Sequence, residues 1–213
     1  MSAPSQDFVQ DDFIRDIAAL DALYGAPAGS SVAKEVGFLT SGYRALIEAS
    51  PFLVLATCGP EGLDCSPRGD APGFVRVVDE KTLLIPDRRG NNRIDSLRNI
   101  VQDPRVALLF LIPGMDETLR VNGRARISTN AELCASFAVD GKAPRKVLEI
   151  SIDTVFFQCA RALLRSRLWH PDSRIDRKSL PSTGTLLAQA SNGREGGEAY
   201  DRALPERLPA SLY

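Results

Sequence analysis

Six short apolar runs constrain the fold of this 213-residue chain more than any other feature of its sequence. Glycine, proline and aspartate separate the runs, as turn residues separate the strands of an antiparallel sheet. In the fifth run, Leu119, Val121 and Gly123 alternate with Arg120, Asn122 and Arg124, which is typical of a strand with one buried face. Regularly spaced short strands favour an antiparallel barrel or sandwich over a parallel sheet, so we predict a mainly β fold with flanking helices. The runs are 51–57, 74–78, 82–86, 105–112, 117–127 and 147–158.

Apolar residues at helical spacing occur before, between and after these runs. Asn130 is a candidate cap for one of the helices. The second helix is expected to break or kink near Gly37 and Gly42. The predicted helices cover residues 11–24, 31–48, 91–102, 130–138 and 159–168.

The last 35 residues differ in composition from the rest of the chain. They are rich in serine, glycine, proline and charged residues, which predicts an extended or partly disordered arm. We therefore expect three regions: a helical segment over 1–50 that packs on the barrel, a β domain over 51–178, and an arm over 179–213.

Charge and hydropathy exclude several classes of protein. The formal net charge is −1, whereas a general nucleic-acid binder carries a strong basic excess. The first 17 residues are acidic where a secretory signal is basic and then apolar, and no apolar run approaches the roughly 20 residues of a membrane span. We expect a cytoplasmic protein with no membrane or nucleic-acid partner. The tripeptide Arg68-Gly69-Asp70 therefore lacks the extracellular context of an adhesion motif.

The cysteines and the histidine argue against a metal site. The four cysteines form no CxxC pair, and His170 is the only histidine, so neither structural zinc nor a disulfide framework is expected. No sequence signature of a hydrolase or metalloprotease occurs, and the carboxylates have ordinary settings, so no catalytic residue is assigned.

The stretch PDRRGNNRIDSL over residues 86–97 is the first candidate site. A strand is predicted to end there, and a helix follows, whose first N–H groups can bind an anion. Arg88, Arg89 and Arg93 add charge, and Asn91 and Asn92 add amide donors. The loop indicates a small-molecule phosphate site, or else a turn with an asparagine cap and solvated arginines.

Three further stretches could contact a planar ligand. In SPRGDAPGF over 66–74, glycines allow close approach, although a bulged edge strand with Arg68 and Asp70 paired explains it too. In 117–127, polar residues including Thr118 and Arg120 share a face, as surface alternation also predicts. In 159–173, Arg161, Arg165 and Trp169 could clamp a ring, or could belong to a surface helix with a core tryptophan.

The order of these motifs resembles the pyridoxamine 5'-phosphate oxidase-like family of FMN-binding split-barrel proteins. The motifs are PFLVLATCGPEG, SPRGD, TLLIPDRRGNNR, DPRVALLF and ETLRVNGRARIS. The resemblance runs from Phe52 to Ile127 and more loosely to Trp169, and it is closest to an uncharacterised branch of probable FMN-dependent enzymes.

This resemblance implies a six-stranded antiparallel split barrel that forms a homodimer and binds FMN at the dimer interface. Arg68 would lie near the polar end of the flavin ring, with Asp70 orienting it, and residues 91–93 would hold the phosphate. Thr118, Arg165 and Trp169 match positions that reach the flavin across the interface. The implied cofactor-binding residues are Arg68, Gly69, Asp70, Ile85, Pro86, Asn91, Asn92, Arg93, Thr118, Arg120, Arg165 and Trp169.

The departures from the family pattern argue against vitamin B6 oxidation. The oxidases proper follow their first arginine with an apolar pair and a lysine, whereas Arg68 is followed by GDAPG. Their Ser-Arg-Lys triplet is replaced by Asn91-Asn92-Arg93, and their C-terminal substrate motif is not recognisable in LWHPDSRIDRK.

The sequence therefore predicts an FMN-dependent oxidoreductase that moves a hydride between a small substrate and flavin. The alternative is a non-catalytic protein that binds or senses flavin, or binds the deazaflavin F420 or haem, on the same fold. The single histidine makes haem the least favoured ligand.

Overall fold

The computed structural model describes residues 13–213, and its contacts divide the chain into two units, Met1–Lys34 and Glu35–Tyr213. The first unit contains α1 (Ile17–Leu23) and α2 (Gly29–Ala33). Asp16 caps α1, because its carboxylate accepts a hydrogen bond of 2.8 Å from the N–H of Ala19. The start of the helix predicted over 11–24 lies outside the described residues, and the packing of this unit on the barrel stays a prediction.

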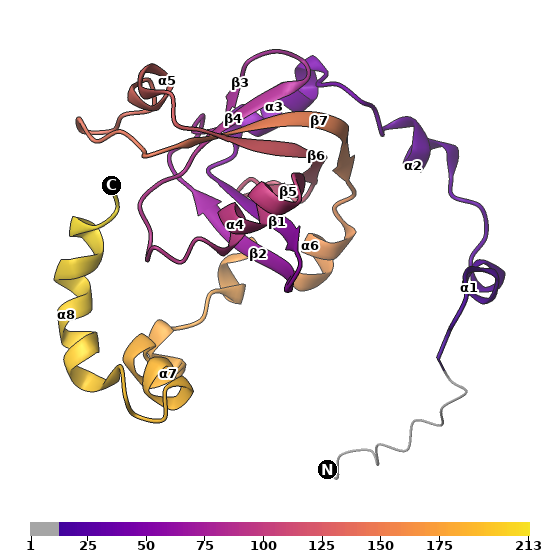
Figure 1. Ribbon diagram of the computed structural model, residues 1–213. Coiled ribbons are helices and arrows are strands. Elements are labelled where there is room, and N and C mark those ends of the chain that lie inside the picture. The colour runs from indigo at the N-terminus through magenta and orange to yellow at the C-terminus, as the bar shows by residue number, and fades with distance from the viewer. Residues whose placement is uncertain (1–12) are drawn as a thin grey trace, which may run out of the picture. The chain divides into compact units, whose positions relative to one another are not determined.

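The second unit is built on one antiparallel sheet of seven strands in the order β2-β1-β5-β6-β7-β4-β3 (Figure 1). The predicted fold class, mainly β with flanking helices, is confirmed, although the sheet has one strand more than the six expected. The strands are β1 (Phe52–Gly59), β2 (Gly62–Gly69), β3 (Arg76–Val77), β4 (Thr82–Pro86), β5 (Arg105–Leu111), β6 (Thr118–Ser128) and β7 (Val147–Gln158).

Strand β2 is the element that apolar runs could not reveal. It pairs only with β1, so it is the edge of the sheet, and its side chains are polar or exposed along most of its length. Pro67 is tolerated there because an edge strand need not donate every N–H to a neighbour. The apolar run at 74–78 gives only the two-residue β3, because Phe74 and Val75 are buried in the loop before it.

The core lies on the face of the sheet that alternation predicted. Leu119 and Val121 of β6 are buried, whereas Arg124 on the opposite face is exposed. Two helices close this core. Helix α3 (Ser41–Ala49) contributes the fully buried Ile47, and α4 (Asp95–Gln102) contributes Leu97 and Ile100.

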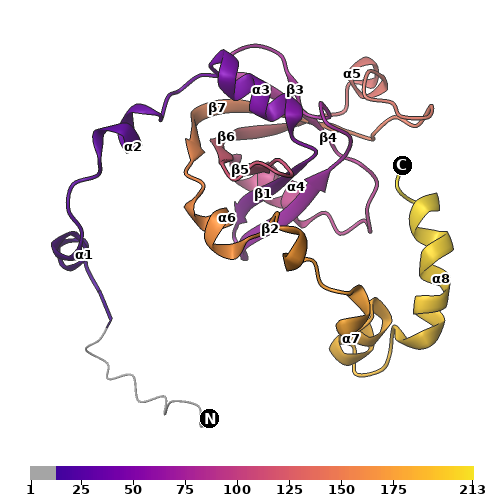
Figure 2. The same cartoon turned by 180° about the vertical axis from the view of Figure 1, so that it is seen from behind.

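Helix α3 is the second half of the helix predicted over 31–48. The predicted break occurs near Gly37, because α2 ends at Ala33 and Val36 pairs with Val155 of β7 before α3 begins at Ser41. Gly42 lies inside α3 and causes no break. Helix α3 lies beside β3, as views from opposite sides show (Figure 2).

Helix α4 is held tightly against the first two strands. The side chain of Asn99 donates a 3.1 Å hydrogen bond to Thr57 Oγ1 on β1. A Cβ on Gly59 would lie 2.1 Å from Asn99 Oδ1, so only glycine leaves room for this contact. The helix predicted over 91–102 begins only at residue 95, and residues 91–94 form a loop over β2.

The shorter predicted helices form at reduced length. Helix α5 (Ala131–Ala135) is capped by Asn130, as expected, and α6 spans Arg161–Ser166. Among the described residues, none of the helices has both the length and the apolar character that crossing a bilayer requires.

The C-terminal region is helical where its composition predicted an extended or partly disordered arm. It forms α7 (Thr183–Ala190) and α8 (Gly197–Ala210) after two short 3-10 turns. Asp201 joins the two helices, because its carboxylate accepts hydrogen bonds from the Ser182 hydroxyl at 2.5 Å and the Gly184 N–H at 2.7 Å. These specific caps, which composition does not reveal, stabilise the helices.

Gly123 offers a test of the sheet register. It lies at a register shift between β6 and β7, and an added Cβ would meet the backbone oxygen of Ser151 at 2.2 Å. We expect Gly123→Ala to lower the free energy of unfolding by about 2 kcal/mol or more, because two backbones must separate. The matched control is Gly42→Ala in α3, where an added Cβ meets only Thr40 Oγ1 at 3.8 Å. Urea unfolding should show that control unchanged or up to about 1 kcal/mol more stable. Equal effects of the two substitutions would contradict this register.

Candidate functional site

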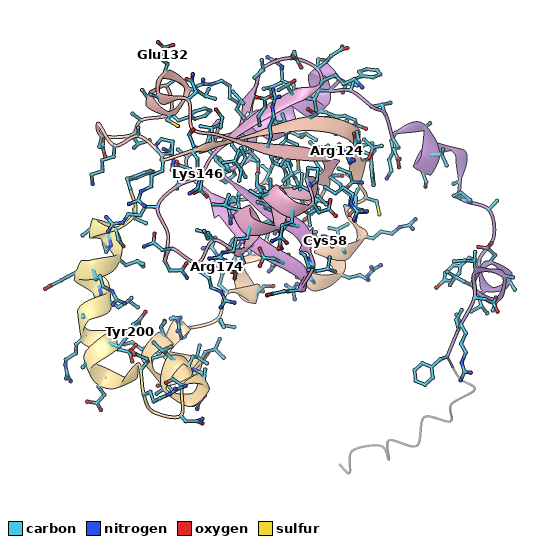
Figure 3. The ribbon with its side chains drawn as sticks, in the orientation of Figure 1. Cys58, Arg124, Glu132, Lys146, Arg174 and Tyr200 are labelled. Atoms are coloured by element: carbon cyan, nitrogen blue, oxygen red, sulfur yellow. The ribbon has the colours of Figure 1, made fainter. Side chains whose placement is uncertain are left out.

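A broad cleft of about 1350 Å³ opens along β2 and the start of α4. It is larger than the roughly 300–1,000 Å³ of typical small-molecule sites. Five parts of the chain line it: strand β2, Phe74, the segment 86–97, the segment 142–146 and Tyr213. The segment 142–146 precedes β7 and includes Lys146, which Figure 3 labels.

The charge of the cleft favours an anionic ligand. Seven basic side chains line it against three carboxylates, although the chain as a whole is nearly neutral. Converging cations of this kind raise the local concentration and the affinity of an anion. The basic residues are Arg68, Arg88, Arg89, Arg93, Lys142, Arg145 and Lys146, and the acidic ones are Asp64, Asp87 and Asp95.

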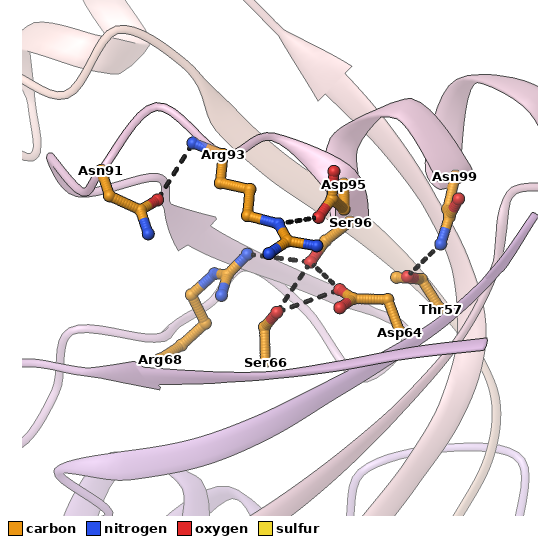
Figure 4. Close-up of polar contacts among 9 residues, drawn as sticks. All are labelled: Thr57, Asp64, Ser66, Arg68, Asn91, Arg93, Asp95, Ser96 and Asn99. Atoms are coloured by element: carbon orange, nitrogen blue, oxygen red, sulfur yellow. Dashed lines mark hydrogen bonds and ion pairs between the residues drawn. The ribbon is translucent and has the colours of Figure 1, made fainter. Parts of the chain in front are cut away.

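A hydrogen-bonded network forms the floor of the cleft (Figure 4). The Ser96 hydroxyl, on the first turn of α4, donates to Asp64 at 2.5 Å, and Ser66 donates to the same carboxylate oxygen at 2.9 Å. Arg68 Nη2 donates to the Ser96 oxygen at 3.4 Å. The hydrogen bond from Ser96 is the main cause that lowers the pKa of Asp64, against the opposing effect of burial. Asp64 is therefore ionised, and it fixes both hydroxyl groups and the nearby arginine.

The loop before α4 is ordered by its own residues. Asn91 Oδ1 accepts the N–H of Arg93 at 3.0 Å, and Asn92 adopts a left-handed backbone with φ of 60°. Arg93 Nε donates to Asp95 at 2.6 Å, and its side chain is 79% exposed. The rest of this guanidinium is free to bind a ligand.

A second network lies at the other end of β2. Arg88 Nε donates to Asp70 at 2.6 Å, and its Nη1 donates to the carbonyl oxygen of Phe137 at 2.7 Å. Tyr213 donates its hydroxyl to the other oxygen of Asp70 at 2.7 Å, and the Arg88 guanidinium lies 5.4 Å from the centre of its ring. Burial alone would raise the pKa of Asp70, but the hydrogen bonds from Tyr213, Ala71 and Arg88 outweigh it and lower the pKa. The hydrogen bond to Asp70 in turn raises the pKa of Tyr213.

The expected role of Asp70 is therefore wrong. Asp70 pairs with Arg88 and not with Arg68, so it neither orients Arg68 nor forms the local pair considered as the alternative. Asp70 lies just beyond the end of β2, where the segment after β4 brings Arg88 within reach. Arg68 is instead held by Ser96 and by the carbonyl oxygen of Pro67.

The remaining charges at the cleft differ in their partners. Lys146 lies 3.6 Å from Asp87, and the backbones of these two residues are joined by a hydrogen bond of 3.0 Å. Arg89, Lys142 and Arg145 are exposed and take part in none of the ion pairs found between residues 13 and 213. These three cations can accept an anion without losing an existing partner.

The structure brings about half of the predicted site residues together. Those that line the cleft are Arg68, Gly69, Pro86, Asn91, Asn92 and Arg93. Ile85 does not line it, because its side chain is 1% exposed and packs in the core.

The predicted residues on β6 and α6 lie outside this cleft. Thr118 is buried at the start of β6, and Arg120 lies with its guanidinium 5.4 Å from the ring of Phe156. Trp169 Nε1 donates to the carbonyl oxygen of Met115 at 2.8 Å, and Arg165 is exposed on α6. Their predicted contact with a ligand across a dimer interface stays a prediction.

Several lining residues were missed by the sequence analysis. Asp64 and Ser66 precede the predicted Arg68 at intervals of two, so this alternation could have revealed a strand with one polar face toward a ligand. For Ser96, the only signal in the sequence was its position near the start of a predicted helix. No local signal identified Tyr213, which is 143 residues from Asp70 along the chain.

The described part of the chain contains no group of three or more His, Cys, Asp and Glu residues arranged to hold a metal ion. His170 lies 2.9 Å from Arg167 Nη2 and accepts the N–H of Asp172, so its ring caps a short turn. Cys58, Cys65, Cys134 and Cys159 are free.

Comparison with known proteins gives a family. A family model described as pyridoxamine 5'-phosphate oxidase matches residues 39–159, which is more than half of the chain. Curated protein sequences give no match.

Several solved structures are similar at low identity. HupZ of Group A Streptococcus is 20% identical with a TM-score of 0.46, over 56% of this chain and 93% of that one. A putative pyridoxamine 5'-phosphate oxidase of Lactobacillus delbrueckii is 21% identical with a TM-score of 0.44, over 57% and 95%. An FMN-binding protein of Syntrophomonas wolfei is 13% identical with a TM-score of 0.41, over 55% and 88%. The family assignment rests on the family model and not on these likenesses.

The floor network gives a prediction about the pKa of Asp64. Replacing Ser96 with alanine removes its main hydrogen-bond donor, so we expect the pKa of Asp64 to rise toward the ordinary 3.8. The native pKa lies below the unfolded one, so ionised Asp64 stabilises the fold above about pH 4 and that contribution is lost as the pH falls through the native pKa. Side-chain carboxyl NMR titration measures the change. Ser166→Ala, which removes a hydroxyl bonded to Leu163 O outside the cleft, is the control. An unchanged Asp64 titration in Ser96→Ala would contradict the network.

Proposed function

Because this chain belongs to the pyridoxamine 5'-phosphate oxidase family, we propose that its basic cleft binds FMN and that the protein is an FMN-dependent oxidoreductase. The observation that carries the proposal is the concentration of seven basic side chains in one cleft, within the part of the chain that the family model matches. Arg68, Arg88, Arg89, Arg93, Lys142, Arg145 and Lys146 all lie between 39 and 159, so the whole basic set falls within that match.

The chemistry of the donors fits a phosphate at the start of α4. Arg68 and Arg93 offer guanidinium groups, which bind phosphate oxygens in pairs of hydrogen bonds. The side-chain amides of Asn91 and Asn92 add neutral donors from the same loop. The loop is already ordered by the Asn91 and Asp95 hydrogen bonds, so little conformational entropy is lost when an anion binds.

The glycine at the end of β2 suits the approach of a flat group. Gly69 lines the cleft with its backbone alone, while the side on which a Cβ would lie is packed against Pro51 O at 3.3 Å and Phe52 at 3.4 Å. Arg68, held through Ser96, supplies a fixed positive charge beside it. When bound, flavin supplies the hydride chemistry, and a positive charge near the ring favours its reduced, anionic form.

We propose a homodimer as the functional form. Thr118, Arg120, Arg165 and Trp169 lie outside the cleft of their own chain, so they can reach a flavin only if a second copy brings them to it. The resemblance of the motifs to the family supports this arrangement, with FMN held between the two copies. The reducing and oxidising substrates are proposed to be small molecules.

Flavin binding is tested first by the visible spectrum of the purified protein and by titration with FMN. We expect Arg93→Ala to raise the Kd for FMN roughly tenfold or more, because a charged hydrogen bond to phosphate is lost. Arg44→Ala removes an exposed arginine of α3 outside the cleft and should leave the Kd unchanged. If Arg93→Ala binds FMN as tightly as the native chain, the phosphate assignment is wrong. A native protein that binds no FMN would point to another anionic ligand, such as the deazaflavin F420.

One observation favours a non-catalytic flavin carrier as the alternative. Each carboxylate that lines the cleft already has a partner: Asp64 with the serines, Asp87 with Lys146, and Asp95 with Arg93. None of them is therefore a free general base. The enzyme proposal does not require one, since hydride transfer to flavin can occur without a protein base.

Anaerobic bleaching of bound flavin separates these alternatives. We expect NADH, NADPH or another small donor to bleach the flavin absorbance, and air to restore it over repeated cycles. An enzyme cycles in this way because bound flavin exchanges electrons with substrates that enter the cleft. Flavin that stays oxidised with every donor tested, but remains bound, would favour the carrier.

A further inference from the structure

Tyr213 is the feature of the cleft that the family motifs do not explain. It lies outside the residues 39–159 that the family model matches, yet its side chain lines the cleft beside Arg88. Helix α8, which leads to it, contacts α7 and has no comparably extensive contact with any strand. The tail therefore returns to the sheet domain chiefly through Tyr213. Figure 1 shows α8 leading back toward the sheet at its C-terminal end.

The contacts of Tyr213 are specific. Its hydroxyl donates to Asp70 Oδ1, while Arg88 holds Oδ2, so the phenol and the guanidinium share one carboxylate. The side chain of Asp70 is only 5% exposed, so it offers the phenol a firmly placed acceptor. The ring of Tyr213 also faces Arg88, whose Nη1 is fixed by Phe137 O. A hydrogen bond and a cation–π contact thus join the tail to the same two side chains.

The volume of the cleft decides what Tyr213 does there. About 1350 Å³ remains with Tyr213 in place, which exceeds a typical small-molecule site. A side chain that blocked the site would fill the cleft. Tyr213 instead leaves most of the volume open and narrows a cleft that is wider than a small ligand requires. It therefore acts as a wall, and an aromatic side chain is well suited to cover part of a planar ligand.

We propose that the region 179–213 is a strap that completes the ligand site, with Tyr213 as its contact residue and Asp70–Arg88 as its latch. Because the latch and the ligand both order the same wall of the cleft, docking of the strap strengthens ligand binding. By linkage, the ligand must strengthen docking of the strap by the same factor. The ligand identity rests on the proposed function, but the latch does not.

The test combines two measurements on the full chain. Hydrogen–deuterium exchange of the peptide over residues 203–213 reports docking of the strap, and titration with FMN reports the ligand. We expect Tyr213→Phe and Asp70→Asn to speed exchange in the absence of ligand. Tyr213→Phe removes the hydrogen bond to Asp70, and Asp70→Asn removes the negative charge that strengthens this bond and the ion pair with Arg88. Asp70→Asn is informative because it leaves the sequence of the strap intact. Saturating FMN should slow exchange in the native chain.

The affinity for FMN should fall in parallel. We expect Tyr213→Ala to raise the Kd at least about fivefold, the lower end of common coupling factors. The matched control is Tyr200→Phe, which removes a hydroxyl from α8, the helix that leads to Tyr213. The ring of Tyr200, labelled in Figure 3, faces Arg207 and does not line the cleft. It should change neither exchange nor Kd.

The outcomes separate the strap from the flavin. Unchanged exchange in Tyr213→Phe and Asp70→Asn would overturn the latch. Faster exchange with an unchanged Kd for FMN in Tyr213→Ala would overturn the role of Tyr213 as a ligand wall. If the native chain binds no FMN while both latch variants speed exchange, the proposed function fails and the latch is supported.

Discussion

The position of α4 on the first two strands is the constraint on which the cleft depends. Asn99 reaches Thr57 of β1 across Gly59, where a side chain on the strand would collide with it. One turn earlier, Ser96 donates to Asp64 of β2. These contacts fix the position of α4 on strands β1 and β2 and its rotation about its own axis. The loop with Asn91, Asn92 and Arg93 is thereby held over the edge strand instead of projecting into solvent.

The same geometry sorts the charges of the cleft into two kinds. Some, such as Arg88 with Asp70 and Lys146 with Asp87, are partly buried and paired. These pairs define the shape of the cleft more than they attract an anion. Others, such as Arg89 and Arg145, are exposed and have no ion-pair partner among residues 13–213. A ligand that enters this cleft meets a preorganised frame with an unsatisfied positive potential around it. This division explains how a nearly neutral chain can favour an anion at one place.

The sequence was sufficient to predict those elements whose residue pattern lies within one short stretch of the chain. Alternation in 117–127 predicted β6 and its buried face, and the turn residues with arginines at 86–93 predicted a lining loop of the cleft. Strand β2 was not recognised because an edge strand facing a polar cleft has no apolar alternation. Asp70 was assigned the wrong partner because Arg88 reaches it only through the pairing of β4 into the sheet. The helices of the tail depend on Asp201 bonding back to Ser182 and Gly184, which composition does not reveal.

The contact between Tyr213 and Asp70 also has a kinetic meaning. It closes a loop of 143 residues, and the entropy of closing so long a loop is unfavourable until the sheet has already brought its ends near each other. Asp70 and Arg88 acquire their positions only when β2 and β4 have joined the sheet. We therefore expect the tail to dock late in folding, after the strands. Because α8 has extensive contacts only with α7, we expect the tail to open locally while the sheet stays intact, which would let the cleft exchange its contents.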